Sequence, residues 1–232
     1  MTGTEQGGDA GVIAIDGPSG TGKSSVAREV ARRLGAEYLD TGAMYRALTV
    51  AVLADGLEPT DAEAVAARSA KLTINIATDP AIDSVYVDGR DVTAAIRSAA
   101  VTAAVSAVSA VPAVRRRLVA AQRRLAQRST TVVEGRDIGS VVFPAARLKI
   151  YLTATPAARA ARRAEQLGLS DPDEVAALAE ALRVRDDLDS TRAESPLRPA
   201  KGAVVIDSTE LSQEDVIEAI LAAVTSRTGR GC

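Results

Sequence analysis

The sequence contains no histidine, and its single cysteine is the last residue, Cys232. Without histidine the chain cannot use Ser-His-Asp or Cys-His catalysis, and it lacks the ligands of the common zinc sites. One cysteine also excludes intrachain disulfides and a thiolate metal cluster, so we expect Cys232 to be an exposed thiol. The chemistry of this protein must therefore proceed without an imidazole group.

Aromatic residues are scarce as well, because the chain has no tryptophan, one phenylalanine and only 2% aromatic residues in all. The core must be built from alanine, valine, leucine and isoleucine, and a nucleotide base would have to stack on arginine or aliphatic groups. A net charge of −2 gives no general attraction to nucleic acid. The cations are almost all arginine, which suits bidentate phosphate contacts, although a biased genome composition would produce the same excess.

The chain also lacks long apolar runs and a targeting segment. No stretch of about 20 apolar residues occurs. Residues 1–11 are polar and glycine-rich, without the basic and apolar regions of a signal peptide. We therefore expect a soluble, cytoplasmic monomer that binds neither membranes nor nucleic acid. Residues 1–10 are predicted to be disordered, and residues 227–232 to form a flexible tail.

What the sequence does contain is a complete phosphate-binding loop, the G-x-x-x-x-G-K-S pattern of Gly17–Ser24. A short apolar strand precedes it at residues 12–16, and residues 25–34 have helical spacing. The glycines let backbone N–H groups surround a polyphosphate, and the helix N-terminus adds partial positive charge. We expect Lys23 to reach the β- and γ-phosphates of ATP, and the Ser24 hydroxyl to contact Mg²⁺. The predicted ATP ligands in this loop are Gly17, Pro18, Ser19, Gly20, Thr21, Gly22, Lys23, Ser24 and Ser25.

Short apolar runs recur along the chain and alternate with helical segments. The predicted buried strands are residues 12–16, 37–40, 131–134, 148–152 and 203–207. This alternation predicts an α/β fold with a five-stranded, parallel, doubly wound core. Between residues 70 and 94 the pattern changes to alternating apolar and polar residues with a turn at Asp88-Gly89, which indicates a small antiparallel β-containing insert. Helices are expected at residues 95–104, 112–128 and 212–226.

Two polar clusters follow predicted strands, where ligands bind in open α/β sheets. The first is Asp40-Thr41-Gly42-Ala43-Met44-Tyr45-Arg46, in which Arg46 could hold an acceptor phosphate; the alternative is a helix cap followed by a surface arginine. The second is Glu134-Gly135-Arg136-Asp137-Ile138-Gly139. Here Arg136 could bind phosphate, Asp137 could accept a hydrogen bond from an amino group, and Glu134 could hold Mg²⁺-bound water. The alternative is a polar turn.

Arginines also recur in the helical stretch 157–192, which is broken near residues 168–172 as a helical lid would be. Arg159, Arg162 and Arg163 share one helix face. Arg185, Asp189 and Arg192 share another face. Arginines on a lid can neutralise charge on a transferred phosphoryl group. Alternatively, Arg185 and Asp189 form an ordinary exposed helix pair of about 0.3–0.5 kcal/mol.

Together, residues 17–24, 40–46, 135–139, 185–187 and 207–209 resemble, in content and order, the bacterial cytidylate kinases. The resemblance implies transfer of the γ-phosphoryl group of ATP to CMP or dCMP, with Mg²⁺. It also implies one P-loop kinase domain at residues 11–226. Its parts would be a core (11–40, 129–156 and 200–226), an acceptor-binding region with the β-insert (about 41–128) and a lid (about 157–192). One departure is Glu134, which stands where we expect aspartate.

By that resemblance, Thr41, Arg115 and Asp137 would contact cytosine, and Arg46, Arg136 and Arg192 would hold the acceptor phosphate. Ser106, Arg185 and Asp189 would hold the sugar, with Ser109 as the alternative to Ser106. Arg159, Arg162 and Arg163 would close on the ATP phosphates. The catalytic residues would be Lys23, Arg136, Arg185 and Arg192, and Mg²⁺ would be held by Ser24, with Glu134 acting through water.

Other functions fit the sequence less well. A kinase for another nucleoside monophosphate, such as UMP, is the nearest alternative. A GTP-binding switch would need N-K-x-D and D-x-x-G segments, and neither occurs. A nucleic-acid-binding ATPase is disfavoured by the net charge and by the lack of stacking aromatics.

Overall fold

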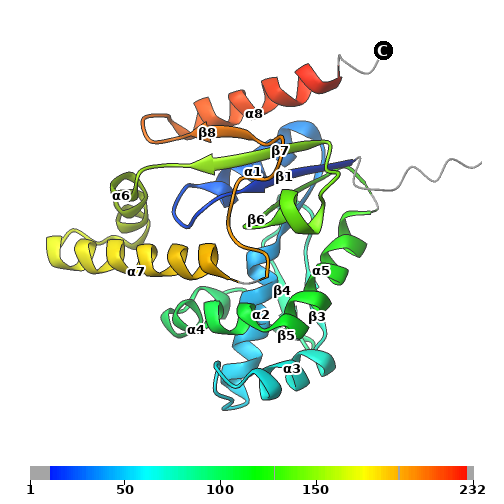
Figure 1. Ribbon diagram of the computed structural model, residues 1–232, viewed down its shortest axis with the longest axis vertical. Coiled ribbons are helices and arrows are strands. Elements are labelled where there is room, and N and C mark those ends of the chain that lie inside the picture. Colours follow the sequence, from blue (N-terminus) through cyan, green and yellow to red (C-terminus); the bar gives the residue numbers. More distant parts are fainter. Residues whose placement is uncertain (1–10, 128, 193, 229–232) are drawn as a thin grey trace, which may run out of the picture.

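The computed structural model describes residues 11–127, 129–192 and 194–228. Its centre is a five-stranded parallel sheet with helices on both faces, in the strand order β2-β6-β1-β7-β8 (Figure 1). This arrangement confirms the predicted doubly wound core, and a second, three-stranded antiparallel sheet confirms the predicted insert. The predicted disordered segment, residues 1–10, lies outside the described residues.

The elements follow one another along the chain much as the sequence predicts. The strands are β1 (Val12–Asp16), β2 (Glu37–Asp40), β3 (Ile74–Ile76), β4 (Val85–Val87), β5 (Arg90–Asp91), β6 (Thr131–Gly135), β7 (Leu148–Thr153) and β8 (Val204–Asp207). The α-helices are α1 (Lys23–Leu34), α2 (Thr41–Ala54), α3 (Ala62–Lys71), α4 (Ala99–Ala110), α5 (Pro112–Ala126), α6 (Pro156–Leu167), α7 (Pro172–Thr191) and α8 (Gln213–Thr228). Two short turns complete the order, the 3₁₀ turn η2 (Ala95–Arg97) and the π turn η3 (Ile138–Val142).

The central strands are buried on both faces, which explains why they appear in the sequence as continuous apolar runs. In β1, Ile13 and Ile15 belong to the core formed with α1 and α8, whereas Val12 and Ala14 belong to the core formed with α2 and α5. All four are at most 1% exposed. Side chains alternate between the faces of a strand, so a strand covered by helices on both sides must be apolar at every position.

The insert is an antiparallel meander of β3, β4 and β5 that packs against α2 through the buried residues Val85 and Val87. Asp88 and Gly89 connect β4 to β5 with φ values of 49° and 79°. Positive φ at both central positions is the geometry of the tight hairpin turn that this dipeptide predicts. The Asp88 carboxylate adds support, because it accepts a hydrogen bond from the backbone of Thr73 and pairs with Arg68.

Several helix boundaries differ from the prediction. The helix predicted at residues 95–104 is two elements, because Ser98 has extended backbone angles and its hydroxyl caps α4 at the N–H of Val101. Helix α5 ends at Ala126. Helix α8 continues to Thr228, two residues past the predicted end, so the predicted flexible tail overlaps the helix at its start. Residues 229–232 lie outside the described residues.

Helices α6 and α7 lie at one edge of the molecule and pack on each other (Figure 1). Helix α6 ends at Leu167 and is capped by Gly168, whose φ of 68° lies in the left-handed region that favours glycine. Helix α7 begins after Asp171, whose carboxylate accepts hydrogen bonds from the N–H groups of Asp173 and Glu174. The break predicted near residues 168–172 is therefore a glycine cap followed by an aspartate cap. Among the described residues, no helix is both long and apolar enough to span a membrane.

Gly17 opens the phosphate loop at a place where no side chain fits. Its φ is 152°, and a Cβ atom there would lie 2.0 Å from the carbonyl oxygen of Leu152 on β7. We expect Gly17→Ala to lower the free energy of unfolding by at least about 3 kcal/mol, because β1 and β7 would have to separate.

Urea denaturation followed by circular dichroism measures this effect. The control is Gly56→Ala, where φ is 67° but no atom lies within 4 Å of the added Cβ. Strain alone should reduce the stability of that variant by about 1–2 kcal/mol. Equal losses in the two variants would contradict the steric explanation.

Candidate active site

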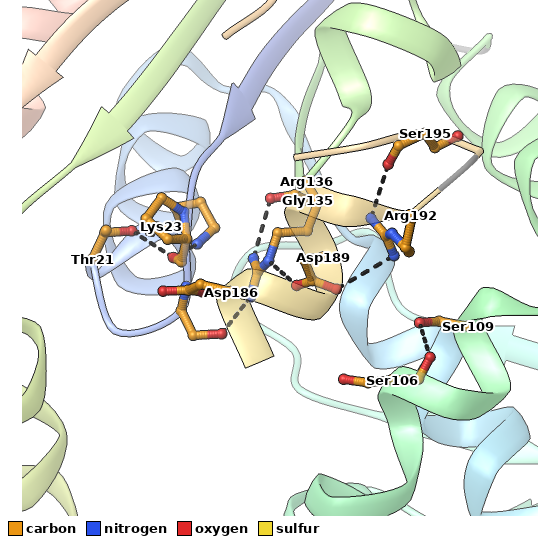
Figure 2. A network of polar contacts seen from close by, with 12 residues as sticks. Thr21, Lys23, Ser106, Ser109, Gly135, Arg136, Asp186, Asp189, Arg192 and Ser195 are labelled. Atoms are coloured by element: carbon orange, nitrogen blue, oxygen red, sulfur yellow. Dashed lines mark hydrogen bonds and ion pairs between the residues drawn. The ribbon is translucent and has the colours of Figure 1, made fainter. Parts of the chain in front are cut away.

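The phosphate loop joins β1 to α1 through three glycines with positive φ: Gly17, Gly20 and Gly22. Lys23 is buried, and its Nζ atom donates to the carbonyl of Pro18 at 2.6 Å and to the Thr21 hydroxyl at 3.3 Å (Figure 2). Burial, and next the charge of Arg136, hold the pKa of Lys23 well below its usual range. A polyphosphate beside this ammonium group would offset both effects.

Ser24 and Ser25 are exposed in the first turn of α1, where the backbone N–H groups have no partner within the helix.

Asp16, which the sequence analysis missed, connects the phosphate loop to the segment after β6. Its two carboxylate oxygens accept hydrogen bonds from the backbone N–H groups of Ile138 and Gly139, both at 2.8 Å. Burial raises the pKa of Asp16 to about 6, against the lowering effect of these two hydrogen bonds. A charged residue at the end of an otherwise apolar strand is the signal that could have identified it.

Glu134 is the next-to-last residue of β6, and it pairs in register with Asp40, the last residue of β2. The Tyr38 hydroxyl donates a hydrogen bond to the buried Glu134 carboxylate, and the Ser24 side chain is a further hydrogen-bonding neighbour. Burial, and next the charge of Asp40, raise the pKa of Glu134 to about 7. Tyr38 is itself held by Arg28, whose guanidinium lies 4.7 Å from the ring centre.

The predicted segment at the end of β2 forms a tight link to β6. Asp40 caps α2 by accepting a hydrogen bond from the N–H of Ala43 at 2.8 Å. The Thr41 hydroxyl donates to the carbonyl oxygen of Glu134 at 2.7 Å. A side chain at Gly135 would meet that hydroxyl at 2.7 Å, so the close approach of the two strand ends requires glycine there. The two predicted polar clusters therefore lie next to each other.

Two residues predicted to contact the base, Arg115 and Asp137, form a buried ion pair with each other. The Arg115 guanidinium lies 5.4 Å from the ring centre of Tyr45 and donates to the carbonyl of Ser109 at 3.2 Å. Ser109 in turn donates its hydroxyl to the carbonyl of Ser106, so α4 contributes its last turns to this part of the site (Figure 2). Sequence reasoning missed Tyr45 as a support for Arg115.

Arg136 connects the phosphate loop to α7. It donates to the Ser19 hydroxyl through Nη2 at 2.7 Å and to the Asp189 carboxylate through Nε at 3.1 Å. Figure 2 shows Asp189 between Arg136 and Arg192, and its second oxygen lies 3.4 Å from Arg192. Asp189 is only 5% exposed. The alternative of an ordinary exposed pair between Arg185 and Asp189 is therefore wrong.

Arg185 and Arg46 complete a group of arginines around this point. The Nε atom of Arg185 is buried without a hydrogen-bond partner among the described residues. Burial, with repulsion from Arg136 and Arg46, lowers the pKa of Arg185 to about 9. Burial likewise lowers the pKa of Arg46 and of Arg192. Arg46 donates to the Thr102 hydroxyl at 2.9 Å and to the carbonyl of Ile96 at 3.1 Å.

The three arginines predicted on α6 have different partners. Arg159 is 8% exposed, donates to the carbonyl of Ser19 at 3.1 Å and forms an ion pair with Asp186 of α7. Arg162 instead bonds the loop after β8, including the hydroxyl of Ser208 at 3.0 Å. Arg163 bonds Gln166 of its own helix at 3.1 Å. Of the three, Arg159 is the one in direct contact with the phosphate loop.

Two groups of cationic side chains therefore lie close together at the carboxyl ends of the strands. One is formed by the phosphate loop with Lys23 and Arg159, and the other by the arginines around Asp189. Arg136 contacts both. This arrangement can hold two phosphate groups close together and neutralise charge between them.

Comparisons with known proteins point to one family. The family model described as "Cytidylate kinase" matches residues 13–226. The chain is similar to the "Cytidylate kinase" of Rhodococcus opacus (strain B4), with 57% identity over 222 residues that cover 95% of this chain and 97% of that one. It is 55% identical to the "Cytidylate kinase" of Nocardia farcinica (strain IFM 10152), covering 95% and 96% of the two chains.

Among solved structures, a gluconokinase from Sinorhizobium meliloti 1021 aligns with a TM-score of 0.50 and 17% identity, covering 94% of each chain. At this identity the likeness concerns the fold alone.

The raised pKa of Asp16 predicts a pH-dependent contribution to stability. The pKa of Asp16 is about 6 in the folded protein, above its ordinary value of 3.8. As the pH rises, Asp16 therefore loses its proton in the unfolded chain before it does so in the folded protein, and its contribution to the free energy of unfolding falls. Asp16→Asn should be less stable at every pH, since its amide nitrogen faces a backbone N–H. Its deficit relative to the wild type should shrink by about 1 kcal/mol between pH 5 and pH 7.5. Urea unfolding at both pH values measures the difference, and a deficit that grows with pH would contradict the assignment.

Proposed function

The chain belongs to the cytidylate kinase family and catalyses the ATP-dependent phosphorylation of CMP or dCMP, and we propose that the loop after β1 binds ATP while the loops after β2 and β6 bind the acceptor. The hydrogen bond between Arg136 and the Ser19 hydroxyl supports this most directly, because it joins the two loops at 2.7 Å. A phosphate on each side of that bond would be positioned for transfer. The relatives do not favour UMP as the acceptor.

The reaction asks for positioning and charge neutralisation rather than proton transfer. The second pKa of a phosphate monoester is near 6, so the CMP phosphate is largely a dianion at pH 7 and already nucleophilic. One of its oxygens attacks the γ-phosphorus of ATP, and ADP leaves. Lys23 neutralises charge on the donor phosphates, and Arg136, Arg185 and Arg192 neutralise charge on the acceptor and on the transferring group. This explains how a chain without histidine carries out the reaction.

We propose that Mg²⁺ accompanies ATP and is held by the Ser24 hydroxyl, with Glu134 acting through water. Within the residues that the structure describes, no group of three or more His, Cys, Asp or Glu side chains could hold a metal. Mg²⁺ typically uses one or two protein oxygens together with substrate phosphates and water, and a buried carboxylate beside a hydroxyl fits that donor set. When bound, Mg²⁺ would neutralise charge on the β- and γ-phosphate oxygens.

Base selection is assigned to Asp137, with Thr41 and Arg115. Cytosine presents an amino donor where uracil presents a carbonyl acceptor. The Asp137 carboxylate would accept a hydrogen bond from the amino group and repel the carbonyl oxygen. Arg115 holds Asp137 in place through their buried ion pair. A site built on such a buried polar contact can reject the wrong base strongly.

The remaining predicted residues are assigned to the edges of the two sites. We propose that Ser106, Arg185 and Asp189 hold the sugar of the acceptor and that Arg46 holds its phosphate. The lid, residues 157–192, would close with Arg159 and Arg163 on the ATP phosphates. Closure would exclude water and suppress ATP hydrolysis.

Lys23→Ala tests the ATP site. We expect it to lower kcat/KM for CMP phosphorylation at least about 100-fold, because the buried ammonium group is a principal positive charge that neutralises the donor phosphates. ADP release with a panel of nucleoside monophosphates measures the loss, and circular dichroism checks the fold. The control, Lys201→Ala, removes an exposed lysine and should keep normal turnover. Near-normal turnover of Lys23→Ala would refute the assignment of this loop.

Asp137→Asn tests base selection. An amide can donate to the uracil carbonyl as well as accept from cytosine, so the CMP/UMP ratio of kcat/KM should fall at least about tenfold. Asn also keeps an acceptor for Arg115, which limits the loss of stability. The control is Asp189→Asn, which should lower kcat for both substrates and leave their ratio unchanged. An unaltered ratio in Asp137→Asn would rule out this role.

A further inference from the structure

The phosphate loop is already in contact with one anion of the protein itself, the carboxylate of Asp186 on α7. Asp186 Oδ1 accepts a hydrogen bond from the backbone N–H of Ser19 at 3.1 Å, although 167 positions separate the two residues. The other carboxylate oxygen forms an ion pair with Arg159. A backbone N–H of a phosphate loop and a guanidinium are the two kinds of donor that bind polyphosphates best. Asp186 therefore uses donors that suit an ATP phosphate.

The surroundings of Asp186 are cationic. Lys23 and Arg185 lie close enough for its negative charge to act on them, and its side chain is only 14% exposed. The next residue, Asp187, is different, because it is 62% exposed and pairs with Arg183 on the same helix. Of these two adjacent carboxylates, one contacts the loop and the other lies in solvent. The geometry of α7 alone does not require Asp186 to contact the loop. The sequence therefore places one negative charge beside the Ser19 N–H and the Arg159 guanidinium.

We propose that Asp186 is a placeholder for an ATP phosphate group, and that ATP must displace it from Ser19 and Arg159. This inference rests on the proposed function, in which the loop binds ATP. A carboxylate and a phosphate repel each other and cannot share the same donors. Displacement would free Arg159 to pair with the phosphate, and it would break the hydrogen bond between the Ser19 N–H and Asp186. ATP entry and movement of the lid are therefore one event.

The part of α7 that carries Asp189, near the proposed acceptor site, does not need to take part in this displacement. Asp189, one helical turn beyond Asp186, contacts Arg136 and Arg192 rather than the backbone of the loop. The competition should therefore act on the donor nucleotide and leave the acceptor unaffected. This separation distinguishes a placeholder from a general change in the charge of the site.

Isothermal titration calorimetry with ADP, with inorganic tripolyphosphate and with CMP tests the proposal on the full chain. Asp186→Asn should bind ADP and tripolyphosphate about tenfold more tightly than the wild type, since a charge-assisted competitor is lost. CMP affinity should change less than twofold. The matched control, Asp187→Asn, removes the same charge one residue away and should leave all three affinities within twofold of the wild type.

Weaker or unchanged tripolyphosphate binding in Asp186→Asn would overturn the proposal, and so would an equal gain for CMP. A wild type that binds neither ADP nor tripolyphosphate would refute the proposed ATP site itself, which is a distinguishable result.

Discussion

The two hydrogen bonds from Ile138 and Gly139 to the Asp16 carboxylate fix the geometry on which the rest of the site depends. Asp16 directly precedes the phosphate loop, and its partners directly follow Arg136 and Asp137. The loops that we propose bind the two substrates are thus fastened to each other at one buried carboxylate. Backbone N–H groups cannot move without the main chain, so this fastening is more rigid than a contact between two side chains.

Around this carboxylate, several arginines form ion pairs with a small number of aspartates. Asp189 pairs with Arg136 and Arg192, and Asp186 pairs with Arg159. Since cations outnumber carboxylates here, the region keeps a surplus of positive charge after every pair has formed. Burial of that surplus is unfavourable until phosphates arrive, as the lowered pKa of Arg185 indicates. The site therefore stores electrostatic free energy that substrate binding releases.

Much of the fold could be predicted from the sequence because its signals are local. The apolar strands, the glycine loop and the Asp88-Gly89 turn depend on neighbouring residues and on burial of whole strands. The residues around the site were predicted by motif, but their partners were not. Spacing along α7 left open an exposed pair between Arg185 and Asp189, whereas Asp189 pairs with Arg136, which lies 53 positions away. Asp16 was missed because its partners are backbone groups more than 120 positions distant, and its charge at the end of an apolar strand is the one local sign of its role.

The scarcity of aromatic residues has an optical consequence. With no tryptophan in the chain, near-ultraviolet absorbance and fluorescence come chiefly from four tyrosines. Tyr38 donates a hydrogen bond to Glu134, and the ring of Tyr45 lies against the Arg115 guanidinium. Burial, and next the charges of the nearby Asp186 and Asp16, raise the pKa of Tyr151. Tyr86, on β4, is the exposed one. Three of the four chromophores therefore adjoin the site, and the unlabelled protein carries its own spectroscopic reporters of what happens there.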